Sequence, residues 1–235
     1  MSEKKILIII PTYNEGLIIG NVVTEFKKYF FEADILVIDA YSSDNTTTEA
    51  IKNGANVIYV DQIFGISLAI ETGILFAHRN NYDFLIRVDG DGQHTAIDVK
   101  ELLSFALKKK IDLTIGSRFL DKSEYHPNNL RLYSIKLLRL LIKVFYKVEV
   151  TDCTSGCQIL SRRLIEKLSY DEEFEYSEVG IICKTSSIKM SVAEKSINMK
   201  KRETGKSTFN LKNSFKYMFK NLLGLITSIN IKFKK

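Results

Sequence analysis

Short apolar runs alternate with longer amphipathic segments through the first half of the chain, and this alternation constrains the fold most. Apolar residues recur at helical spacing in residues 15–31, 46–52, 67–78 and 97–109. Runs expected as strands lie before, between and after them, at residues 6–10, 35–38, 57–60, 84–88 and 113–115. Alternation of this kind predicts an α/β fold with a mostly parallel sheet and helices on both faces. We expect Pro11 to stop the first strand.

Carboxylates directly follow two of the predicted strands. Asp39 follows the second run, and Asp89 and Asp91 follow the fourth, in the stretch D-G-D-G-Q-H. Ligands of open α/β sheets bind beyond the carboxyl ends of the strands, so we expect these side chains on one rim. Mg2+ and Mn2+ prefer oxygen ligands and typically use one or two carboxylates plus substrate phosphates. The pair Asp89 and Asp91 therefore indicates either a divalent-cation site or a plain turn, but not an EF-hand, because Lys100 stands where that loop needs glutamate.

Size, charge and cysteine content narrow the class of protein. With 235 residues and 45 % hydrophobic content, the chain is long enough for one globular domain. Its net charge of +6 favours anionic partners, but no nucleic-acid-binding motif is recognised. Three cysteines without a paired framework indicate a reducing compartment, and no apolar stretch reaches the length of a membrane span. We expect the protein to be made and kept in the cytoplasm.

Two basic amphipathic segments lie in the second half of the chain, at residues 132–148 and 211–229. In the first, we expect an apolar face of Leu137, Leu138, Leu141, Phe145 and Val148, and a basic face of Lys136, Arg139, Lys143 and Lys147. Helices of this type lie in membrane interfaces or pack on a core with a solvated lysine face. Two such segments with a lysine-rich end favour a peripheral position on an anionic membrane. Residues 208–235 are then a basic C-terminal amphipathic helix appended to the main domain.

Six short motifs together resemble the family 2 glycosyltransferases, which have the GT-A fold, and most closely the dolichyl- and polyprenyl-phosphate sugar synthase branch. They are I-P-T-Y-N-E at 10–15, V-I-D at 37–39 with Ser42, Asp44 and Thr46, D-G-D-G-Q-H at 89–94, G-S-R-F at 116–119, S-G-C at 155–157 and R-E-T-G-K-S at 202–207. The resemblance implies a Rossmann-like GT-A domain over residues 1–207. Residues 1–120 would bind the nucleotide sugar and residues 121–207 would form the acceptor side.

The resemblance also implies roles for individual residues. The nucleoside would be held by Pro11, Tyr13, Glu15 and Asp39, with Asp39 accepting a hydrogen bond from the base. The cofactor, Mg2+ or Mn2+, would be held on the diphosphate by Asp89, Asp91 and Gln93. Phosphate charge would meet Arg118, Arg202 and Lys206. Physical chemistry supports the last set independently, because a departing nucleoside diphosphate must be neutralised by cationic groups; the alternative is solvated surface charge.

The chain departs from the family pattern near Asp39. Many relatives carry a second aspartate where this chain has Ala40, and glycine where it has Tyr41. The segment around Gly65 also lacks the basic residue that relatives often place there. The nucleotide of the donor is therefore not identified by the sequence.

The reaction that the resemblance implies is an inverting, metal-dependent hexosyl transfer from a nucleotide-diphosphate sugar, with Asp91 central to catalysis. A polyprenyl phosphate acceptor (dolichyl or undecaprenyl) needs no general base, because its phosphomonoester has a second pKa of about 6. A hydroxyl of a lipid-linked or cell-surface glycan would need one, and the candidates are Asp152 and Glu178. The alternative for Asp152 is a turn carboxylate.

Two rival functions stay open at this point. Ala40 permits a non-catalytic nucleotide-sugar-binding subunit, although the retention of Asp89 and Asp91 argues against it. A sugar nucleotidyltransferase would be expected to open with a glycine-rich loop, where this chain has P-T-Y-N. The partners expected are a nucleotide sugar, a polyprenyl phosphate or lipid-linked glycan, the cytoplasmic face of an anionic membrane, and potentially a membrane-anchoring subunit.

Overall fold

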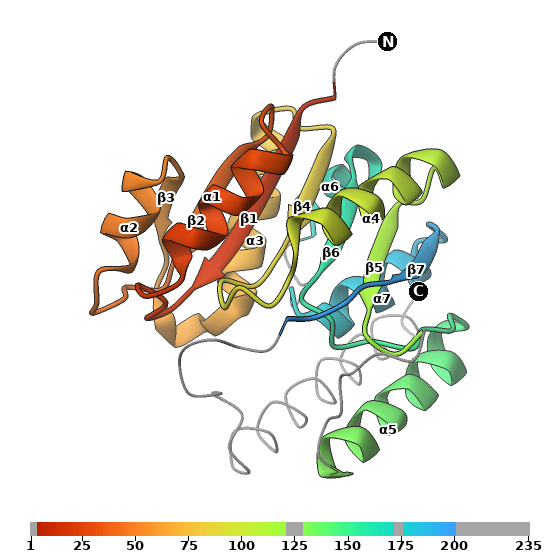
Figure 1. Cartoon of the computed structure of the whole chain (residues 1–235). Coiled ribbons are helices and arrows are strands. Elements are labelled where there is room, and N and C mark those ends of the chain that lie inside the picture. The colour runs from red at the N-terminus through yellow and green to blue at the C-terminus, as the bar shows by residue number, and fades with distance from the viewer. Residues whose placement is uncertain (1–3, 121–128, 172–175, 201–235) are drawn as a thin grey trace.

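The computed structural model describes residues 4–120, 129–171 and 176–200, and its core is a seven-stranded sheet (Figure 1). The strand order is β3-β2-β1-β4-β6-β5-β7. The strands are β1 (Ile6–Thr12), β2 (Asp34–Asp39), β3 (Asn56–Tyr59), β4 (Phe84–Arg87), β5 (Leu113–Ser117), β6 (Gln158–Ser161) and β7 (Val192–Ser196). Every neighbouring pair is parallel except those of β6, which runs antiparallel to both β4 and β5.

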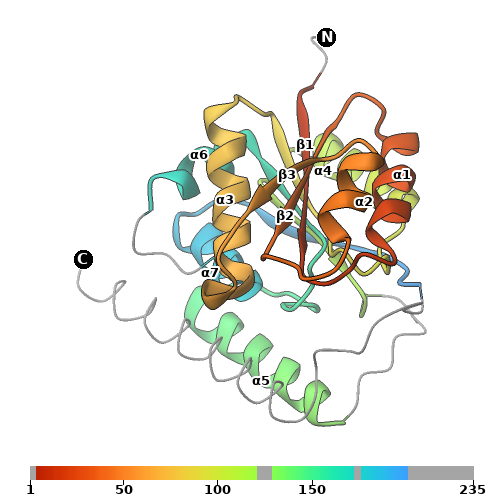
Figure 2. The ribbon, with the colours of Figure 1, turned by 90° about the vertical axis from the view of Figure 1, so that its left-hand side faces the viewer.

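Helices cover both faces of this sheet, as predicted (Figures 1 and 2). The helices on one face are α1 (Ile19–Tyr29), α2 (Thr46–Lys52) and α4 (Ala96–Lys109). Those on the other face or beyond it are α3 (Gly65–Arg79), α5 (Asn129–Tyr146), α6 (Arg162–Ser169) and α7 (Glu178–Ser187), with a short 3-10 turn at Gln62–Phe64 before α3. The predicted mostly parallel α/β sheet is confirmed.

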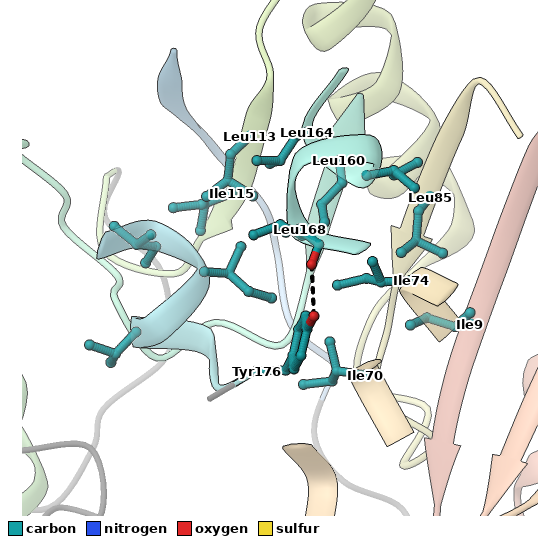
Figure 3. Close-up of a cluster of buried hydrophobic side chains, with 14 of the residues drawn as sticks. Ile9, Ile70, Ile74, Leu85, Leu113, Ile115, Leu160, Leu164, Leu168 and Tyr176 are labelled. Carbon is teal, nitrogen blue, oxygen red and sulfur yellow. Dashed lines mark hydrogen bonds between the residues drawn. The ribbon is translucent and has the colours of Figure 1, made fainter. Parts of the chain in front are cut away.

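The alternation of side chains along β1 explains why the sheet is covered twice. Leu7 and Ile9 pack into the core on the α3 face, while Ile8 and Ile10 pack into the core on the α1 face. Successive residues of a strand point to opposite faces, so an unbroken apolar run requires a helix layer on each side. Figure 3 shows part of the first core, where the Tyr176 hydroxyl donates to the Leu168 carbonyl at 2.8 Å.

Two predicted element boundaries were wrong. Pro11 does not stop β1, which continues to Thr12 with Pro11 opposite Ile38 of β2. The proline is tolerated because β1 is paired with β4 only as far as Ile9, so that beyond it only one side of the ladder remains. The first helix begins at Ile19, not at residue 15, because the backbone before it is engaged by another loop, described below.

The second half of the described chain holds α5, which matches the predicted helix over residues 132–148. The predicted helix at 211–229, the 208–235 segment, Arg202 and Lys206 lie outside the described residues. Among the described residues, no helix has the length and apolar character needed to cross a membrane. Cys153, Cys157 and Cys183 are buried free thiols.

Candidate active site

The loops that follow β1, β2 and β4 meet at one edge of the sheet. β2 and β4 flank β1 and run parallel to it, so their carboxyl ends lie together. The Ala40 amide donates to the Thr12 carbonyl at 3.0 Å, which ties the second loop to the first. Gly90 packs so closely that an added Cβ would lie 2.6 Å from Cγ2 of Thr12. The structure therefore brings the first three sequence motifs into one place.

Backbone amides of the first motif donate hydrogen bonds to side chains of the second motif. The Asn14 amide donates to Ser42 Oγ at 2.8 Å, and the Gly16 amide donates to Asp44 Oδ2 at 3.0 Å. In return, the Ser43 amide donates to Asn14 Oδ1 at 2.8 Å. These bonds hold residues 14–16 outside the helix that the apolar spacing predicted. Tyr13 is exposed, and Pro11 and Glu15 are half-buried.

Asp39 is fully buried and serves its own loop. Its Oδ1 accepts from the amide and hydroxyl of Ser42 at 3.0 and 2.5 Å, and its Oδ2 accepts from Thr47 Oγ1 at 2.6 Å. The carboxylate thus orders the turn from β2 into α2. Its predicted bond to a nucleobase stays a prediction, and would need an approach to a side chain that is enclosed here.

Two exposed tyrosine rings stack beside Asp39. The ring centroids of Tyr41 and Tyr59 are 5.4 Å apart, and Tyr59 stands opposite Asp39 in the sheet register. Tyr41 has a φ of 53°, in the left-handed region that favours glycine. The sequence contained one signal for this conformation, because Tyr41 stands where many relatives carry glycine.

Asp89 sits among cationic and aromatic groups at the end of β4. Its Oδ1 lies 3.7 Å from Arg87 Nη2, and its Oδ2 lies 3.4 Å from His94 Nε2. Burial raises the pKa of Asp89, but the neighbouring His94 ring and the charges of Arg87 and Arg118 outweigh it and hold the pKa well below its usual range. Asp89 is therefore ionised at neutral pH.

Arg87 links this carboxylate to the second half of the chain. It is almost completely buried in β4, and its Nη2 donates to Glu178 Oε1 at 2.6 Å. Glu178 is the first residue of α7, so the ion pair joins two elements that are 91 residues apart. A charged residue inside an otherwise apolar strand was a sequence signal for Arg87, and no role was predicted from it.

Arg118 and Asp152 form a second buried ion pair. Arg118 Nε donates to Asp152 Oδ2 at 2.6 Å and Arg118 Nη2 donates to Oδ1 at 2.7 Å. The Arg118 amide adds a bond to Oδ2 at 3.1 Å, and its Nη2 also reaches Thr154 Oγ1 at 3.0 Å. The G-S-R-F and S-G-C motifs are joined in the same region, since Ser155 Oγ donates to the Gly116 carbonyl at 2.6 Å. Asp152 is thus the fixed partner of Arg118, and its role as a base stays a prediction.

The chain segment before R-E-T-G-K-S is anchored on the predicted metal motif. The Lys200 amide donates to the Gln93 carbonyl at 2.9 Å, and Gln93 Nε2 donates to the Lys200 carbonyl at 3.1 Å. Glu25 of α1 bonds to both segments: it accepts from the Ala96 amide and from Lys200 Nζ, each at 2.9 Å. No sequence motif connected Glu25 with the site. Its contacts fix the point from which the motif with Arg202 and Lys206 leaves.

Comparison with known proteins decides the family. The model of glycosyl transferase family 2 matches residues 7–169, more than half of the chain. The chain is a family 2 glycosyltransferase. It is 27 % identical over 228 residues to polyprenol monophosphomannose synthase of Mycolicibacterium smegmatis, covering 92 % of this chain and 85 % of that one. It is 26 % identical over 190 residues to a UDP-N-acetylglucosamine–dolichyl-phosphate N-acetylglucosaminyltransferase of Methanococcus voltae, covering 72 % and 74 %.

Solved structures confirm the GT-A fold of this glycosyltransferase. Glucosyl-3-phosphoglycerate synthase of Mycobacterium tuberculosis, in complex with Mn2+, UDP-glucose and phosphoglyceric acid, superposes with a TM-score of 0.74. The two chains are 15 % identical, and the match covers 97 % of this chain and 81 % of that one. At this level of identity the likeness concerns the fold. The resemblance to family 2 glycosyltransferases noted in the sequence is confirmed.

The residues of the transferase fit a divalent cation that is completed by substrate. Within the described ranges, no group of three or more histidine, cysteine, aspartate or glutamate residues could hold a metal ion. Asp89 and Asp91 offer two carboxylates at a loop where Gly156 leaves room for that of Asp89, and Mg2+ and Mn2+ take their remaining ligands from phosphates and water. Gln93 has its side-chain amide nitrogen tied to Lys200, so its amide oxygen is the atom that could face a cation.

Gly156 offers a test of this arrangement. A Cβ at this position would lie 2.2 to 2.5 Å from the carboxylate atoms of Asp89. We expect Gly156→Ala to displace Asp89, to lower turnover by about 10- to 100-fold and to weaken Mn2+ binding measured by electron paramagnetic resonance. Gly20→Ala is the matched control, because its nearest contact is the flexible end of Asn53. Unchanged Mn2+ binding in Gly156→Ala would contradict the placement of Asp89 at the metal.

Proposed function

We propose that the protein transfers a sugar from a nucleotide-diphosphate sugar to a polyprenyl phosphate, with inversion, on the cytoplasmic face of a membrane. The observation that carries the proposal is the position of Asp89. Its carboxylate is held ionised where the loops after β1, β2 and β4 meet. Relatives named for polyprenol, undecaprenyl phosphate and dolichyl phosphate acceptors support the lipid acceptor.

In this proposal the described residues hold and orient the donor. Asp89 and Asp91, with Gln93, would hold Mg2+ or Mn2+, which when bound would neutralise the diphosphate as it leaves. Pro11, Tyr13, Glu15 and Asp39 would form the nucleoside side of the site. Arg118, with Arg202 and Lys206, would meet the remaining phosphate charge. Arg87 would position the carboxylate of Asp89, and Arg87 is itself held by its ion pair with Glu178.

The engagement of both candidate bases favours a phosphate acceptor over a hydroxyl. Asp152 is bonded to Arg118 through both oxygens, and Glu178 faces Arg87 in a buried pair. A carboxylate whose oxygen atoms already accept hydrogen bonds from a buried arginine is not positioned to receive a proton from an acceptor hydroxyl. A phosphomonoester with a second pKa of about 6 is already ionised at neutral pH and needs neither residue as a base. A membrane-anchoring partner subunit gains no support from the relatives and is not part of the proposal.

The experiment is to incubate the full chain with a panel of nucleotide sugars and Mn2+, with and without undecaprenyl or dolichyl phosphate, and to measure the mass of the lipid. We expect one donor to add one sugar to the lipid, and chelation of the metal to stop the reaction. Donor binding without hydrolysis or transfer would indicate a non-catalytic binding subunit. Transfer to a lipid-linked glycan, and not to the lipid phosphate, would show that the acceptor is a hydroxyl.

A further inference from the structure

The outer face of α5 carries an exposed apolar stripe. Tyr133, Leu137, Leu140 and Val144 are 70 %, 46 %, 56 % and 59 % exposed. Their spacing of four, three and four residues places them on one face of the helix. The opposite face packs into the core through Ile135, Leu138, Ile142 and Tyr146. The stripe is therefore not needed for the packing of α5 on its own domain.

This division differs from the one that the sequence predicted. Leu137 and Leu138 were expected on one apolar face, but Leu138 is buried in the core while Leu137 is exposed on the outer side. The helix is apolar on two opposite sides, whereas the sequence pattern predicted one apolar face and one basic face. Single exposed apolar residues are common on protein surfaces, whereas a contiguous row of them marks a site of interaction.

Lysines flank the stripe along one side. Lys136 and Lys143 are exposed and seven residues apart, which keeps them in a row on α5, and the exposed Lys147 directly follows the last residue of the helix. Lys136 Nζ lies 6.0 Å from the Tyr133 ring, beside the stripe. Lys143 is paired with Glu149 at 2.6 Å, so its charge is partly offset. The surface thus combines apolar side chains with a row of cations.

The position of α5 relates this surface to the active site. Figures 1 and 2 show α5 beyond the end of the sheet toward which the β1 arrow points. The loops after β1, β2 and β4, which carry the donor motifs, lie at that same end. A planar partner that contacted α5 would therefore meet the protein at the end where the reaction takes place.

We propose that this stripe and its lysine row form the surface by which the protein docks on an anionic bilayer. The inference rests on the proposed function, because a polyprenyl phosphate resides in a membrane. Tyr133, Leu137, Leu140 and Val144 enter the boundary between headgroups and acyl chains, and the lysines lie on anionic headgroups. The lysine row favours a lipid surface over a second copy of this chain, whose net charge of +6 would repel it.

The first test is flotation of the full chain with vesicles of phosphatidylglycerol and phosphatidylcholine. We expect Leu137→Gln combined with Leu140→Gln to weaken vesicle binding at least about tenfold. Phe31→Gln combined with Leu107→Gln is the matched control, since both residues are exposed and apolar, Phe31 just after the end of α1 and Leu107 in the last turn of α4. The control should bind within about twofold of the unmodified chain. Unchanged binding by the stripe variant would overturn the proposal and direct attention to residues 208–235.

The second test addresses charge. We expect Lys136→Gln combined with Lys147→Gln to weaken binding to anionic vesicles by about fivefold for each lysine, and to leave the weak binding to pure phosphatidylcholine vesicles unchanged. Lys108→Gln combined with Lys109→Gln, at the end of α4, keeps the same net charge and should have little effect. Equal losses in the two variants would overturn the role of the lysine row.

Two further measurements separate the possible failures. A short, water-soluble prenyl phosphate without vesicles should be glycosylated equally by the stripe variant and the unmodified chain. The unmodified chain could fail to glycosylate any prenyl phosphate while the stripe substitutions still abolish vesicle binding. In that case the docking surface stands and the proposed function falls. Light scattering that showed a dimer dissociated by the stripe substitutions would assign the surface to a second copy and contradict docking on lipid.

Discussion

Replacing Asp91 with alanine is expected to abolish metal-dependent transfer while leaving the fold intact. Asp91 follows β4 in the D-G-D-G-Q-H loop, and its Oδ1 accepts from the Gln93 amide at 3.1 Å. The side chain is half-buried at a rim and lies outside both cores. If Asp91 is one of two carboxylates that hold a diphosphate-bound cation, its loss weakens the binding of that cation and should lower turnover by about 100-fold or more.

The measurement is the initial rate of glycolipid formation over a range of Mn2+ concentrations, together with thermal unfolding by circular dichroism. Asp61→Ala is a matched control, because Asp61 is an exposed carboxylate whose Oδ1 likewise accepts from a backbone amide two residues ahead, that of Ile63. We expect the control to retain turnover. Undiminished turnover in Asp91→Ala, with its dependence on Mn2+ unchanged, would remove Asp91 from the metal site.

The first half of the fold could be predicted because its strands are covered on both faces. Residues 6–10 of β1 and 35–38 of β2 are apolar without interruption, and only a sheet between two helix layers buries such runs. The second half gave weaker signals. β6 has four residues, and β7, V-A-E-K-S, is half-buried throughout and contains no apolar run. The insertion of β6 between β4 and β5 depends on contacts far apart in the sequence, which local patterns do not report.

The same limit applies to the site. The strand-end rule placed Asp39, Asp89 and Asp91 at one edge because it depends only on local runs and parallel order. The partners of Asp152 and Glu178 could not be found that way, since their arginines are 34 and 91 residues distant in the chain. Without knowledge of those ion pairs, each carboxylate resembled an available base. The arginine partner of each carboxylate therefore decides what chemistry to expect of it, and that partner is known only from the structure.

The Arg118–Asp152 pair provides the largest expected effect on stability. Asp152 is fully buried, and its carboxylate accepts three bonds from Arg118. Asp152→Asn would leave the guanidinium buried without its counter-charge, so we expect the free energy of unfolding to fall by about 3–5 kcal/mol. Urea denaturation of the purified chain measures it. Glu101→Gln breaks the exposed pair with Lys195 and is the matched control, with an expected change within about 1 kcal/mol.

The double variant Arg118→Met with Asp152→Leu separates the structural role from the chemical one. Replacing both members of a buried pair by apolar residues of similar size is often neutral for stability, so we expect most of the lost free energy to return. Turnover should not return if Arg118 meets the diphosphate, because methionine offers no positive charge. A base role for Asp152 makes a different forecast for the single variant: Asp152→Asn would lose turnover with a hydroxyl acceptor and keep it with a phosphate acceptor, whereas a disturbed Arg118 would lower turnover with both. Stability and turnover measured on these two proteins therefore decide whether Asp152 acts through Arg118 or on the acceptor itself.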